Sequence, residues 1–178
     1  MSSLFRNIIR FILFLAIQVY VLNRVPHLHR FINPSIYFLF ILWLPFSVKN
    51  RWLLVIAFLL GISMDYFTVT PGLHASACVL IAYIRPFLIN ILTPRDSSEF
   101  NYREPSPQSM QMAPYAVYIV VLTFIHHGFL LFLEWLSVGA FWEFLVNVLS
   151  STAVSLLLIF TVELLFPRKM KYRTNTAG

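Results

Sequence analysis

The chain has 178 residues, of which 59% are hydrophobic and only 11% are charged, and its mean hydropathy is +0.77. This composition excludes an ordinary soluble domain, about a quarter of which is charged, and one cysteine and five glycines exclude disulfide-rich and collagen-like chains. An integral membrane protein remains, and because the basic residues behind the net charge of +6 lie between or beyond apolar runs, they indicate membrane orientation and no nucleic-acid partner.

Six apolar stretches are predicted to cross the membrane, since a spanning helix needs about 20 predominantly apolar residues. The predicted spans are approximately 4–22, 34–48, 52–69, 72–92, 114–135 and 140–166. The first begins with Arg6 and Arg10 like a signal peptide, but no small-residue cleavage site follows it, so we expect a retained helix. The second begins at Asn33-Pro34 and contains Pro45, so it should be short and bent.

Residues 93–113 form the longest polar segment, and their charges, prolines and serines predict a flexible cytoplasmic linker. The other connections are short, so residues 1–178 are expected to form one transmembrane domain with a basic cytoplasmic tail at 167–178. Lysines and arginines accumulate on the side of the membrane that holds both termini. The positive-inside rule therefore predicts cytoplasmic N and C termini.

Two stripes of small residues predict a tightly packed hairpin between the third and fourth spans, because small residues let membrane helices approach closely. On the third span the stripe recurs every four residues and so shares one face: Ala57, Gly61 and Asp65. On the fourth span it falls within about 80° of arc: Ala75, Cys78, Ala82 and Arg85. Thr70-Pro71-Gly72 makes the turn between them.

Ionisable residues inside a bilayer are costly, so each needs a partner or a role. Asp65 and Arg85 are offset by roughly 15 Å along the hairpin, which is too far for contact. His74 matches the depth of Asp65, so we expect the backbone or His74 to satisfy this carboxylate, with partner binding, a conformational role or acid–base chemistry as alternatives. Arg85 is expected to reach toward lipid phosphates or to meet Glu163 on the last span.

The adjacent residues His126-His127 suggest a metal site, but their geometry opposes it. Neighbouring helical residues diverge by about 100°, and no cysteine or carboxylate lies three or four residues away to complete a site. We expect a packed or interfacial pair, with His127 and Glu134 on a second polar face. Since the sequence also lacks a nucleophile–base pair, paired catalytic carboxylates and a phosphate-binding glycine loop, it predicts no enzyme, no cofactor and no metal.

The hairpin resembles the MreD family of rod shape-determining proteins. The residues that carry this resemblance are Gly61-Ile62-Ser63-Met64-Asp65, then Pro71-Gly72-Leu73-His74-Ala75, and Arg85, while His126-His127 and Leu133-Glu134 are similar to one branch of the family. The resemblance implies a subunit of the cell-elongation complex, which makes peptidoglycan and sets rod shape, in a bacterial cytoplasmic membrane. Its implied partners are an MreC-like single-span protein and, through it, a RodA-type glycosyltransferase, its transpeptidase partner and the MreB filament.

The family is also similar to the membrane substrate-binding subunits of energy-coupling-factor transporters, which implies an all-α compact bundle of six transmembrane helices. Two functions therefore stay open. The first is a non-catalytic scaffold that offers its helix faces to partner membrane helices and lipids. The second is a small-molecule-binding subunit of a vitamin-type transporter, which needs a polar pocket in the outer half of the bundle lined by Asp65, His74 and His127.

Overall fold

The computed structural model describes residues 3–24, 33–93, 104–138 and 141–165, and within these ranges the regular secondary structure is entirely helical. Among the described residues, five helices are long and apolar enough to cross a membrane. They are α1 (Ser3–Tyr20), α3 (Asn50–Thr68), α4 (Leu73–Leu92), α6 (Met112–Val138) and α7 (Phe141–Leu165). The described residues also include three short helices: η1 (Leu22–Arg24), α2 (Leu39–Leu42) and α5 (Pro107–Met110). The chain is thus a multi-pass membrane protein with an all-α bundle, as its composition predicts.

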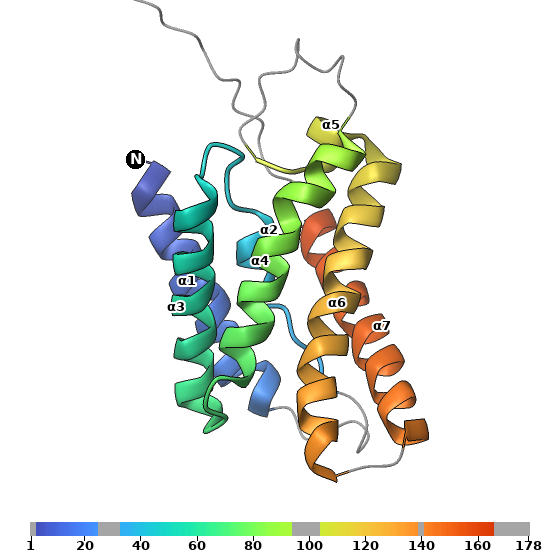
Figure 1. The fold of residues 1–178 in the computed structure, drawn as a ribbon. Helices are drawn as coiled ribbons and strands as arrows, with labels where there is room; N and C mark the ends of the chain where they lie inside the picture. Colours follow the sequence, from blue (N-terminus) through green and yellow to red (C-terminus); the bar gives the residue numbers. More distant parts are fainter. Residues whose placement is uncertain (1–2, 25–32, 94–103, 139–140, 166–178) are drawn as a thin grey trace, which may run out of the picture.

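The long helices stand side by side, with α1, α3 and α6 running from one end of the bundle to the other and α4 and α7 running back (Figure 1). α3 packs against α4, α4 against α6, and α6 against α7, while α1 contacts α3 and α2. One end of the bundle, which we call the N end, holds the starts of α1, α3 and α6 and the ends of α4 and α7. The opposite end, which we call the turn end, holds the α3–α4 connection, the ends of α1 and α6 and the start of α7.

The expected second spanning helix, 34–48, is wrong. Only Leu39–Leu42 is α-helical, and turns and extended backbone flank it. Pro34 and Pro45 bracket the segment, and proline lacks an amide donor and disfavours helical backbone in the residue before it. We call residues 33–48 the unwound crossing; it runs through the middle of the bundle (Figure 1), and its side chains from Ser35 to Leu44 are buried.

Unwound backbone is tolerated at membrane depth only where protein groups satisfy its amides and carbonyls. Here four different long helices supply side chains for that purpose. The pairs are Ser35 N–H with Ser155 Oγ of α7 (2.9 Å), Ile36 N–H with Gln18 Oε1 of α1 (2.9 Å), the Leu42 carbonyl with the Tyr118 hydroxyl of α6 (2.9 Å), and the Leu44 carbonyl with Arg85 of α4. The crossing is therefore held by tertiary hydrogen bonds in place of helical ones.

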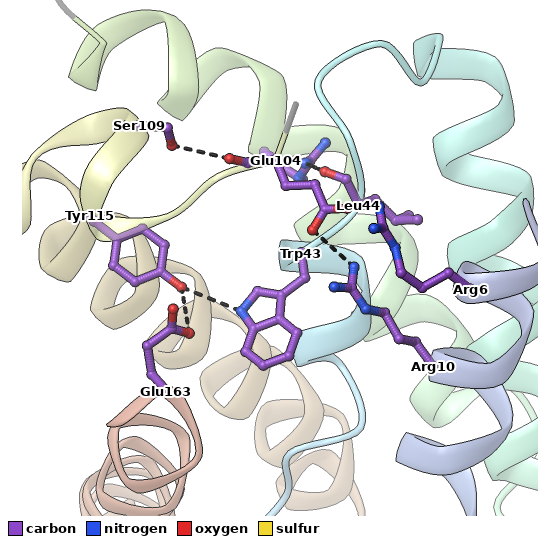
Figure 2. Close-up of polar contacts among 9 residues, drawn as sticks. Arg6, Arg10, Trp43, Leu44, Glu104, Ser109, Tyr115 and Glu163 are labelled. Atoms are coloured by element: carbon purple, nitrogen blue, oxygen red, sulfur yellow. Dashed lines mark hydrogen bonds and ion pairs between the residues drawn. The ribbon is translucent and has the colours of Figure 1, made fainter. Parts of the chain in front are cut away.

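The predicted flexible linker, 93–113, is wrong in its second half, because residues 104–113 are built into the N end. Ser106 and Ser109 form a reciprocal capping box at the start of α5, and Met110 is fully buried. The Glu104 carboxylate accepts hydrogen bonds from Arg6 (2.8 Å) and Arg10 (2.9 Å) of α1, as Figure 2 shows. Residues 94–103 and the predicted tail at 167–178 lie outside the described residues.

Candidate functional site

The predicted hairpin forms, and at Gly61 the backbones of its two helices approach each other closely. A Cβ atom added at Gly61 would lie only 2.7 Å from the Ala75 backbone nitrogen and 2.7 Å from the His74 carbonyl oxygen. The rest of both small-residue stripes is buried in the bundle: Ala57, Asp65, Ala75, Cys78, Ala82 and Arg85. A glycine is therefore required at position 61 for the backbones to touch.

Asp65 ties the end of α3 to the start of α4. Its carboxylate accepts hydrogen bonds from the backbone N–H groups of Gly72 (3.1 Å), His74 (2.8 Å) and Ala75 (3.0 Å), and from the Thr70 hydroxyl (3.2 Å). The first turn of a helix leaves its N–H groups unpaired and favours negative charge. Asp65 therefore caps α4 from the neighbouring helix. His74 contacts this carboxylate through its backbone N–H and not through its imidazole ring.

The turn between α3 and α4 holds unusual backbone conformations. Gly72 has φ of 84°, which suits glycine, and Val69 has φ of 58° at the end of α3. A β-branched residue in the left-handed region is rare and costs of order 1–3 kcal/mol. The Asp65 carboxylate, with the Thr70 N–H on the Asp65 carbonyl (3.2 Å), stabilises this turn, while Pro71 is exposed at its tip.

The expectation that Arg85 reaches the membrane surface or Glu163 is wrong. Arg85 is only 3% exposed, and it donates to the Tyr118 hydroxyl (3.0 Å) and to the Leu44 carbonyl. Glu163 instead accepts a hydrogen bond from Tyr115 (3.1 Å), as Figure 2 shows. Arg85 is thus a clamp on the unwound crossing.

A buried polar network lies where the crossing meets α4 and α6. The Tyr37 hydroxyl is hydrogen-bonded to His74 Nδ1 (2.9 Å) and to His126 Nε2 (2.8 Å). Because a phenol carries one proton, at least one of these imidazoles acts as the donor. His127 points to other partners, Ser155 Oγ (2.9 Å) and Ser35 Oγ (3.3 Å), as the divergence of adjacent helical residues predicts.

A cavity of about 400 Å³ opens beside this network in the half of the bundle nearer the turn end. Its walls come from α1, the unwound crossing, α3, α4, α6 and α7. His74, His127 and Glu134 line it, but Asp65 does not. Among the described residues, no group of three histidines, cysteines or carboxylates could hold a metal ion. The arrangement is thus a chamber large enough for a small molecule, with hydrogen-bonding groups on mixed polar and apolar walls.

Sequence reasoning missed Gln18, Ser35, Tyr37 and the α7 serines as parts of the site. A usable signal was present in α7, where Ser151 and Ser155 lie four residues apart and therefore share one face of the helix. Their hydroxyls accept the Asn33 and Ser35 amides of the crossing. Tyr37 gave no such signal, because aromatic residues abound in every span.

The chain was also compared with known proteins. No protein-family model matches it, and no curated protein and no solved structure is significantly similar to it.

Proposed function

We propose that the protein is a non-catalytic scaffold of the bacterial cell-elongation complex, and that it binds partner membrane helices through the exposed face of α4. The observation that carries the proposal is Tyr83, whose side chain is 72% exposed although it lies in the middle of a spanning helix. It is the eleventh of the 20 residues of α4, so about 15 Å of helix separates it from either end.

The environment of Tyr83 favours a protein neighbour over lipid. Phe87 and Ile91 follow it at four-residue steps on the same face and are also exposed, so this face is apolar except for the phenol. Within the described part of the chain, the phenol has no hydrogen bond. A hydroxyl that faces hydrocarbon without a hydrogen-bond partner costs from about 1 to several kcal/mol. A helix that carries serine, threonine, asparagine or glutamine at this depth would satisfy it.

The identity of the partner comes from the family resemblance, which names an MreC-like single-span protein in the bacterial cytoplasmic membrane. The other implied members, the RodA-type glycosyltransferase, its transpeptidase and the MreB filament, would associate through that protein. The N end, which carries Arg6, Arg10, Lys49 and Arg51, would face the cytoplasm by the positive-inside rule.

Co-purification tests this proposal with a matched pair of variants. Tyr83→Phe removes the phenol at the membrane centre, and Tyr66→Phe removes one that is 81% exposed near the turn end, where water can pair with it. A hydrogen bond between membrane helices contributes about 0.6–2 kcal/mol, so Tyr83→Phe should weaken retention of the single-span partner by about three- to thirtyfold.

Tyr66→Phe should retain the partner like the parent protein. Equal retention by both variants would refute the α4 surface. Recovery of only partners unrelated to cell-wall synthesis would refute the elongation-complex assignment.

A second candidate function, the small-molecule-binding subunit of a vitamin-type transporter, is favoured by one observation, the 400 Å³ cavity. Its volume falls in the range of small-molecule sites. A tight ligand stabilises the folded state by mass action, so one vitamin in a thermal-shift screen should raise the unfolding midpoint by several degrees. A flat response across all vitamins would remove this candidate.

A further inference from the structure

We propose that the cavity binds a small primary amine with an aromatic or branched apolar body, and that the ammonium group pairs with Glu134. This inference rests on the second proposed function, because both require that the cavity is a small-molecule site. It adds the chemical class of the ligand. It does not depend on the scaffold function, whose surface on α4 lies elsewhere.

The charged groups that line the cavity determine whether it favours a positively or a negatively charged ligand. Among the described lining residues no lysine or arginine occurs, and Glu134 is the one carboxylate. Glu134 is exposed, which places it at the mouth of the cavity. A carboxylate at the mouth of a chamber with low-dielectric walls attracts cations and repels carboxylates and phosphates. An aliphatic primary amine is protonated near neutral pH, as the lysine side chain is.

The His74 imidazole on the cavity wall offers a hydrogen bond that the protein does not use itself. His74 is only half buried and bonds Tyr37 through Nδ1, so its Nε2 atom is left for a ligand. Most of the other polar groups on the wall are already engaged: Tyr37 with two imidazoles, and His127 with Ser155 and Ser35. The site therefore suits a ligand with few polar atoms.

The remaining walls require an apolar body. Met64 and Phe67 of α3, Leu130 and Leu131 of α6, and Val154 of α7 line the cavity. Burial of apolar surface against such side chains supplies most of the binding free energy of small ligands, while the few polar groups set orientation. In a ligand that carries an indole or a branched alkyl group and one ammonium group, the apolar group would pack against these walls and the ammonium group would lie at the opening beside Glu134.

The charge preference can be tested with three probes that share an indole ring and end in an amine, an alcohol or a carboxylate: tryptamine, tryptophol and indole-3-propionate. The full-length protein in detergent should gain thermal stability with millimolar tryptamine, less with tryptophol and none with indole-3-propionate. Glu134→Gln should weaken tryptamine binding by about two- to fivefold, the range for an exposed ion pair. Val154→Phe, which adds bulk to the wall, should weaken the binding of both tryptamine and tryptophol.

Glu143→Gln is the matched control, because Glu143 is exposed in the first turn of α7 and does not line the cavity. It should bind tryptamine like the parent. Stabilisation by indole-3-propionate equal to that by tryptamine would overturn the inference, and so would equal losses in Glu134→Gln and Glu143→Gln. If a vitamin binds and tryptamine does not, the amine class is refuted and the second proposed function survives; if nothing binds, both fall.

Discussion

Gly61→Ala is the smallest change that tests the close approach of α3 and α4. The added Cβ would lie 2.7 Å from two backbone atoms, the Ala75 nitrogen and the His74 carbonyl oxygen, whereas ordinary van der Waals contact begins near 3.4 Å. Because backbone atoms cannot rotate away as a side chain can, the two helices must move apart.

The size of the effect follows from two contributions. Overpacking of a well-packed interior costs about 1–3 kcal/mol. Asp65 lies one turn further along the same face, and its bonds to the His74 and Ala75 amides, now 2.8 and 3.0 Å, would lengthen as the helices separate. Hydrogen bonds to a charged group contribute about 1.5–3 kcal/mol. The two contributions together lead us to expect that Gly61→Ala lowers the free energy of unfolding by about 2.5–6 kcal/mol.

The measurement is the free energy of unfolding in mixed micelles titrated with SDS. Gly128→Ala is the control, since a Cβ at Gly128 in α6 meets nothing within 4 Å. It should be neutral or slightly stabilising, because alanine forms helices better than glycine by about 1 kcal/mol. If Gly61→Ala is as stable as Gly128→Ala, the close approach at Gly61 does not exist and the reasoning is refuted.

Three further outcomes follow from the polar contacts. Asp65→Asn should lower the free energy of unfolding by about 2–3 kcal/mol in the same titration, because an amide nitrogen cannot accept hydrogen bonds from the N–H groups of α4. It should also reduce partner retention. Parent-like values would contradict the capping role. Tyr118→Phe should cost about 2–3 kcal/mol, since it leaves a buried carbonyl and the Arg85 guanidinium each short of a partner, whereas Tyr20→Phe at an exposed site should be neutral. Glu104→Gln should cost about 1 kcal/mol at low salt and less at high salt, because its two ion pairs lie near the surface; a loss independent of salt would argue against an electrostatic tie.

The hairpin could be predicted from sequence because its determinants are local. Gly61 and Asp65 lie four residues apart on one helix, and a short turn places the start of the next helix beside them, so helical periodicity alone aligns the small residues. The depth match between Asp65 and His74 followed from the same arithmetic. The helical rise per residue does not show which atoms of His74 contact the carboxylate.

The unwound crossing could not be predicted, because residues 34–48 are as apolar as a spanning helix. Their conformation is decided by hydrogen bonds from Gln18, Arg85 and Tyr118 and from the serines of α7, which are far away in the chain. In the sequence alone, each of these side chains is a polar group in a membrane-spanning segment, which is energetically unfavourable. Only the packed bundle pairs each of them with a backbone group that would otherwise be unsatisfied.

The sequence by itself determined that the chain inhabits a membrane as an all-α bundle, because hydropathy and length are properties of each segment alone. The tertiary structure decided that the five long helices of the described residues pack around a crossing that is α-helical only at Leu39–Leu42, that Arg85 faces inward, and that a cavity lies beside His74 and Glu134. The physical reason is that a hydrogen bond or a cavity wall needs two or more segments at a set distance, and packing alone sets that distance.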